Sequence, residues 1–225
     1  FFKLLLGNGV HGIAYVLTFS ITNIAFVLSI QNTNVANTLV MIATAPMISA
    51  VFSIFFLNEK TERNTSIAII ITFFAVVYIF YDSMKIGNFV GDILGLVAGV
   101  GLAAGAVIIR SAKKRNLVPS AVIGKLVVAI VGLFFIESFT LVGSDLYIIP
   151  AMCILCVAIP FVLVTIAPRF ITAAEVNIFF LLETILGPLW VWMVIKEQPS
   201  LETILGGFVI IITIAIHSLL AIKKT

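Results

Sequence analysis

The chain has 225 residues, of which 62% are apolar and 10% are charged, and its formal net charge is +3. Soluble domains are about 45–50% apolar and about 25% charged, so a soluble core could not hide this much apolar surface. The composition excludes a soluble domain and predicts a single domain that lies in the lipid bilayer.

Eight apolar runs follow one another along the chain, each close to the length of about 20 residues that a membrane-spanning helix needs. The strands of a membrane β-barrel are about half as long and alternate in polarity, which these runs do not. We therefore predict an all-α, polytopic bundle of about eight transmembrane helices. The runs cover residues 9–30, 34–57, 65–82, 90–110, 119–139, 147–166, 173–195 and 202–222.

The basic residues predict the orientation of these helices. Eleven of the 13 Lys and Arg residues fall on the side that holds both chain ends, and only Lys85 and Lys196 fall on the other. The positive-inside rule then places both chain ends in the cytoplasm of a multi-pass protein of the cell (inner) membrane. The cluster Lys113, Lys114 and Arg115 could suggest nucleic acid, but a topology signal beside anionic membrane lipid is the better interpretation. No nucleic-acid partner is expected.

A stripe of polar side chains follows one face of the first run. His11, Tyr15, Thr18 and Thr22 recur at spacings of 4, 3 and 4 residues, as neighbours on a helix do. Polar groups at membrane depth usually face a partner or a water-filled cavity. We predict that the stripe lines a substrate cavity, with hydrogen bonding between helices as the alternative.

The seventh run contains Asn177 and Glu183, and Glu183 lies near its middle. A carboxylate at that depth is the most costly residue in the chain, so it is either a substrate or proton site or a group satisfied by a neighbouring helix. Trp190 belongs to an aromatic belt or to a cavity wall. Pro188 in this run and Pro46 in the second remove backbone hydrogen bonds and predict kinks.

The fourth run carries a row of small residues that includes Gly95 and Gly99 at a step of four. Small residues at this spacing let two helices approach closely. The functional interpretation is a seam that slides during a conformational change, and the structural one, which we favour, is tight packing.

Motifs of membrane enzymes are missing from the sequence. Cys153 and Cys156 form a C-x-x-C pair, but no second pair and no nearby His completes a zinc site. No nucleotide-binding loop, catalytic serine motif or metalloprotease motif occurs. We predict that the protein is not an enzyme, with no catalytic residues, no metal and no cofactor.

Three stretches resemble the drug/metabolite transporter superfamily, in its EamA-type branch. They are NVANTLVMIATAPMISAVFSIFFLNEKTERNT (34–65), GDILGLVAGVGLAAGAVIIRSAKKR (91–115) and TAAEVNIFFLLETILGPLWVWMVIKEQPSLETILGG (172–207). Pro46 and Pro188 match the two mid-helix prolines of this pattern, and Glu59 and Glu197 match its two terminal acids. Glu59 and Glu197 fall on opposite sides of the predicted membrane, as an inverted repeat requires.

The resemblance implies ten helices in two inverted five-helix repeats. Residues 1–82 would then be the remainder of the first repeat, with three helices, and residues 83–225 the second repeat, with five. The resemblance thus predicts that the first two helices of the family are missing here, and Phe1 in place of Met favours a truncated sequence.

By this resemblance we expect a secondary transporter of small organic solutes that exports metabolites or amino acids by alternating access. The stripe and Glu183 would line its cavity, with Glu183 as a proton-coupled or amine-binding group. A proton as coupling ion and a homodimer are both compatible with this interpretation. Two other classes stay open: a membrane enzyme acting on a lipid or isoprenoid, and a helical subunit that does not transport.

Overall fold

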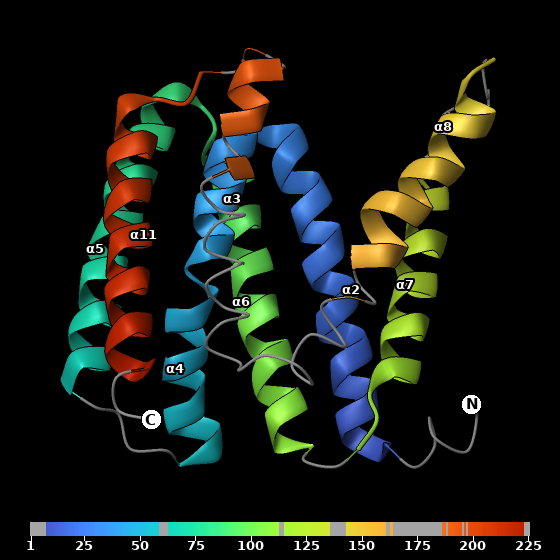
Figure 1. Ribbon diagram of the computed structural model, residues 1–225, viewed down its shortest axis with the longest axis horizontal. Helices are drawn as coiled ribbons and strands as arrows, with labels where there is room; N and C mark the ends of the chain where they lie inside the picture. Colours follow the sequence, from blue (N-terminus) through green and yellow to red (C-terminus); the bar gives the residue numbers. More distant parts are fainter. Residues whose placement is uncertain are drawn as a thin grey trace.

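The computed structural model describes residues 8–58, 63–112, 115–135, 143–160, 163, 186–187, 189–194, 196 and 198–222. These residues form helices and loops and no strand, which confirms the all-α prediction. The helices shown in Figure 1 are α2 (Gly9–Asn32), α3 (Val35–Ala43), α4 (Ala45–Leu57), α5 (Arg63–Ile86), α6 (Phe89–Ser111), α7 (Val118–Leu133), α8 (Asp145–Met152), the π-helix η1 (Cys153–Ala158) and α11 (Leu201–Ile222).

Within these ranges, five helical spans are long and apolar enough to cross a membrane: Gly9–Asn32, Val35–Leu57, Arg63–Asp82, Phe89–Ser111 and Leu201–Leu220. They coincide with the first four predicted runs and the last one. Two shorter apolar helices, Val118–Leu133 and Asp145–Ala158, lie in the fifth and sixth runs. Most of the seventh run falls outside the described residues. The protein is therefore a polytopic helical membrane bundle.

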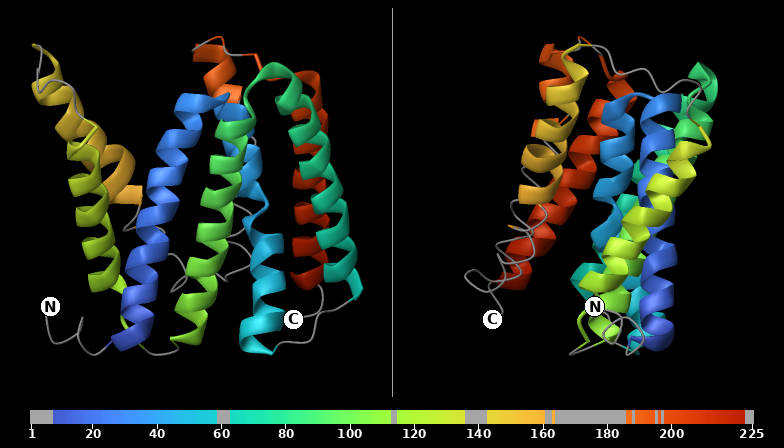
Figure 2. Two further views of the ribbon diagram at one scale, coloured as in Figure 1. Left: turned by 180° about the vertical axis from the view of Figure 1, so that it is seen from behind. Right: turned by 90° about the vertical axis from the view of Figure 1, so that its right-hand side faces the viewer.

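Helix α6 lies in the middle of the bundle, where it packs against α2, α3 and α4 (Figures 1 and 2). Helix α11 packs against α5 and α3, and α7 lies beside α2 on the opposite flank. An apolar core lies among α3, α4, α5 and α11, where side chains from these four helices pack together. Its buried members include Val40, Met41, Met47, Ile79, Ile210 and Ile214.

The helices run in both directions through the bundle, so each end of the bundle holds the starts of some helices and the ends of others. Helix α2 begins at the end of the bundle where α11 finishes, and α2 finishes at the opposite end, where α6 and α11 begin (Figure 1). Asn58 stops α4 because its backbone turns into the left-handed conformation, at φ 53°, which asparagine tolerates better than most residues. Pro119 stands in the first turn of α7, where its missing N–H would have no helical partner anyway.

Large apolar side chains cover the outer surface of the bundle. Phe55 is 74% exposed and Phe134 is 84% exposed. In water such side chains would favour aggregation, whereas in lipid they meet a solvent of their own polarity. The helical backbone satisfies its own hydrogen bonds, so these faces can lie against hydrocarbon.

Candidate functional site

Two residues of the polar stripe of α2, Tyr15 and Thr22, face α6. A Cβ added to Gly101 would clash with the Thr22 hydroxyl, and one added to Gly105 would lie 3.6 Å from a ring carbon of Tyr15. The two glycines thus leave room for the two polar side chains. The structure brings Tyr15 and Thr22 into a close interface between two helices.

The hydroxyl groups of the stripe bond within their own helix. Thr18 Oγ1 donates to the carbonyl oxygen of Ala14 at 2.7 Å, and Thr22 Oγ1 donates to the carbonyl oxygen of Thr18 at 2.7 Å. A threonine in a helix can satisfy its hydroxyl in this way without any partner from another helix. Thr22 therefore contributes to the α2–α6 interface through its shape, and the role of both threonines in substrate binding stays a prediction.

His11 lies at the end of the stripe, in the first turn of α2. Arg115 Nη1 lies 3.4 Å from His11 Nδ1 and donates to the carbonyl oxygen of Asn8 at 2.9 Å. Asn8 Nδ2 in turn donates to the carbonyl oxygen of Asn116 at 2.8 Å. Because the arginine is always a donor, it favours the histidine tautomer with its proton on Nε2. This cluster ties the start of α2 to the loop before α7.

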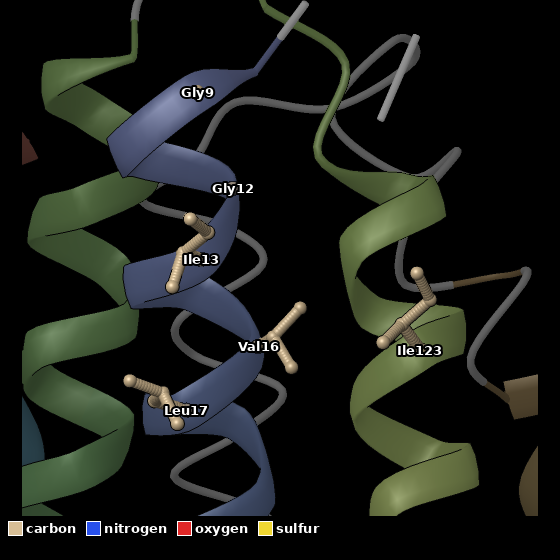
Figure 3. A pocket seen from close by; sticks show the side chains of 6 residues that line it. All are labelled: Gly9, Gly12, Ile13, Val16, Leu17 and Ile123. Carbon is tan, nitrogen blue, oxygen red and sulfur yellow. The ribbon is translucent and has the colours of Figure 1, made fainter. Parts of the chain in front are cut away.

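A groove of about 260 Å³ opens between α2 and α7. Figure 3 shows the side chains of Val16 and Ile123 on its two facing helices, and the remaining lining residues are Gly9, Gly12, Ile13 and Leu17. Its walls are apolar, and none of the four stripe residues lines it. The groove therefore does not join the predicted polar site.

The second membrane span is interrupted near its middle. Helix α3 ends at Ala43 and α4 begins at Ala45, with Pro46 in the first turn of α4. The hydroxyl of the intervening Thr44 donates to the carbonyl oxygen of Met41 at 2.6 Å, and this threonine is only 1% exposed. Thr44 keeps helical backbone angles (φ −72°, ψ −14°), so the interruption is a buried kink within one membrane span. An interruption lies where Pro46 predicted a kink.

The small residues of α6 pack against this interruption. A Cβ added to Gly99 would lie 2.9 Å from the carbonyl oxygen of Met41, and one added to Gly95 would lie 3.0 Å from Ser29 Oγ. Contacts this short leave no room for a larger side chain. The structure agrees with the tight-packing interpretation, and the glycines of α6 serve two neighbours: α2 on one face and α3 with α4 on the other.

Comparison with known proteins identifies the family. The model of the EamA-like transporter family matches residues 5–81 and 89–219, which is most of the chain. The chain belongs to the EamA-like transporter family. It is therefore a multi-pass membrane transporter of the drug/metabolite type, which confirms the resemblance found in the sequence. No curated protein and no solved structure gives a significant match.

Several residues that the sequence singled out in this EamA-like transporter fall outside the described ranges. Trp190 is described, in the helical stretch 189–194, where it is 59% exposed. An exposed tryptophan on a membrane helix fits an aromatic belt as well as a cavity wall. The residues outside the described ranges are Glu59, Asn177, Glu183, Pro188 and Glu197.

The sequence interpretation overlooked a buried polar network in this EamA-like transporter. Asp92, in the first turn of α6, is 0% exposed, and its carboxylate accepts hydrogen bonds from Thr33 Oγ1 at 2.6 Å and from Asn37 Nδ2 at 3.1 Å. The first-turn position also favours a negative charge. An acid close to the end of a span looks solvated in the sequence. The available signal was the polar composition of residues 32–38, at the start of the neighbouring span.

Proposed function

We propose that this transporter is a secondary carrier that exports small organic solutes, such as metabolites or amino acids, by alternating access. The observation that carries the proposal is the buried interruption at Thr44, in the middle of a membrane span. In carriers, discontinuous helices lie where the substrate site is formed and where the two halves of the protein move.

The surroundings of the interruption support movement. Gly99 of α6 lies directly against it, and Gly101 and Gly105 lie against Thr22 and Tyr15 of α2, respectively. Since the Thr22 hydroxyl is bonded inside α2, a shift of α2 along α6 breaks no hydrogen bond of that threonine. Such a shift would also require the Ser29–Gly91 hydrogen bond between the two helices to break.

The substrate site in this proposal combines the stripe of α2 with the seventh predicted span. His11, Tyr15, Thr18 and Thr22 supply polar contacts, Asn177 and Trp190 complete the wall, and Glu183 binds an amine or a coupling proton. An ionisable residue in a membrane span is a functional site by default, because hydrocarbon would otherwise make its charge costly. The two matched ranges, 5–81 and 89–219, correspond in this proposal to the two inverted repeats.

The distribution of basic residues supports the orientation. With both chain ends in the cytoplasm of the cell (inner) membrane, 11 of the 13 Lys and Arg residues lie on the cytoplasmic side. Arg115, beside His11 at the start of α2, belongs to this cytoplasmic side.

Counterflow in proteoliposomes tests the carrier function. The purified chain is reconstituted with a panel of unlabelled amino acids inside, and uptake of the same labelled amino acids is followed. A carrier that alternates accumulates the labelled solute inside above its outside concentration, because it exchanges it for unlabelled solute that leaves. A pore only equilibrates the label. Uptake equal to that of protein-free liposomes for every member of an amino-acid and organic-acid panel would contradict the proposal.

The role of Glu183 is tested with Glu183→Gln in the same assay. We expect the variant to lose most of its exchange, or to exchange at a rate that no longer changes with pH. Glu202→Gln, the same substitution in the first turn of α11, is the matched control and should keep both properties. An unchanged rate with an unchanged pH profile in Glu183→Gln would remove this residue from the site.

A further inference from the structure

A chain of hydrogen bonds joins three helices at the end of the bundle opposite the start of α2. The Asn37 amide of α3 lies at its centre. Its Nδ2 donates to both carboxylate oxygens of Asp92 at 3.1 Å, and its Oδ1 accepts from Thr203 Oγ1 of α11 at 2.6 Å. The three side chains are 0%, 2% and 3% exposed for Asp92, Thr203 and Asn37. One amide thus links α6 to α11 and uses both of its ends.

Further polar contacts surround this chain. Thr33 Oγ1 donates to Asp92 at 2.6 Å, and Ser29 Oγ lies 2.7 Å from Thr38 Oγ1 and donates to the carbonyl oxygen of Gly91 at 2.7 Å. Ser29 and Thr38 are both completely buried. The start of α6 is therefore bonded to the end of α2 and to the start of α3 through side chains.

The backbones also approach closely at this end. A Cβ added to Gly91 would lie 2.5 Å from the backbone carbonyl carbon of Asn32, so only glycine fits here without a shift. Such an approach leaves no space for water between α2 and α6. At this end α2 and α6 touch through their backbones, and the Ser29–Gly91 hydrogen bond beside this contact joins the two helices.

We propose that the Asp92–Asn37–Thr203 chain is a clasp that keeps this end of the transporter closed and that breaks when the end opens to admit or release solute. The inference rests on the proposed carrier function. Asn37 belongs to the first family-matched range and Asp92 and Thr203 to the second, so a movement of one part against the other must break these bonds.

Polar groups suit a clasp better than apolar ones. A buried carboxylate or amide without a partner is costly, so the clasp separates only where water can replace the lost bonds. Opening and hydration of this end are thereby coupled, and a partly open, dry state is disfavoured. An apolar contact would impose no such condition.

Cysteine labelling tests the clasp directly. In a background in which both exposed native cysteines, Cys153 and Cys156, are replaced by Ala, Ser29→Cys places a thiol at a position that is 0% exposed. The rate at which a membrane-impermeant maleimide labels it in proteoliposomes reports how often this end opens. Thr203→Val removes one bond of the clasp, together with the contact of the Thr203 hydroxyl with Ser200 Oγ at 3.0 Å, and keeps the side-chain shape. We expect the labelling rate to rise about three- to tenfold, as loss of one hydrogen bond predicts.

Matched variants separate opening from general loosening. Thr203→Ser keeps the hydroxyl and should label at the rate of the unaltered clasp. Thr213→Val is the same substitution on the same helix, at a hydroxyl that donates within α11 to the Val209 carbonyl, and should leave the rate unchanged. A second reporter, Ser53→Cys in α4, is 6% exposed and should not respond.

Two results would overturn the clasp: no rise at Ser29→Cys, or an equal rise at Ser53→Cys. If Thr203→Val does not fold, Thr33→Val removes another bond to Asp92 and gives the same test. The labelling assay needs no solute. Absent counterflow with the expected labelling would therefore refute the carrier function alone, and counterflow with unresponsive labelling would refute the clasp alone.

Discussion

The Thr22 hydroxyl of α2 occupies the space that a Cβ on Gly101 of α6 would fill. This one pairing sets how near α2 and α6 can lie, since the neighbouring Gly105 leaves room for Tyr15 in the same way. The polar face of α2 thus packs against the face of α6 that carries its small residues.

Gly101→Ala should destabilise the protein by about 1–3 kcal/mol, because the added methyl group forces the two helices apart. The midpoint of thermal unfolding in detergent, followed by size-exclusion chromatography, measures this. Gly132→Ala in α7 is the control, since a Cβ there would meet nothing within 4 Å. Equal midpoints for the two variants would show that the Thr22 contact does not limit the approach of α2.

Thr72→Val in α5 should stabilise the protein by about 1 kcal/mol. Within the described part of the chain, the Thr72 hydroxyl is buried and has no hydrogen-bond partner, so its removal relieves a desolvation cost at constant shape. Thr38→Val, at a hydroxyl that is bonded to Ser29, should destabilise by a similar amount. Unfolding midpoints that move in the same direction for both variants would contradict this account.

Pro46→Ala should slow exchange in the counterflow assay while it raises or preserves the unfolding midpoint. The substitution restores a backbone N–H, which lets α3 and α4 fuse into one straight span. We expect a rate about fivefold lower, which corresponds to about 1 kcal/mol on the step that moves the span.

The control for this prediction is Pro119→Ala. Pro119 stands in the first turn of α7, where no helical hydrogen bond is missing, so the same substitution should leave exchange unchanged. A normal rate in Pro46→Ala would separate the interruption at Thr44 from the transport cycle.

The candidate site was predicted only in part. The spacing of His11, Tyr15, Thr18 and Thr22 correctly places them along one helix, because a period near 3.6 residues needs nothing beyond the local chain. What that face meets was not predictable, and Tyr15 and Thr22 lie against glycines. The row of Gly95 and Gly99 did indicate close packing, since small residues have few other uses on a membrane helix.

The sequence by itself determined the class of this protein, its apolar spans and its family. Hydropathy is a sum over neighbouring residues, and the lipid bilayer demands that each span satisfy its own backbone hydrogen bonds, so these properties are local. Only the tertiary structure decided that Asn37 bridges Asp92 and Thr203, whose positions lie 55 and 166 residues away from it. Such contacts depend on which helices become neighbours and how each is rotated, and that outcome belongs to the packing of the whole bundle.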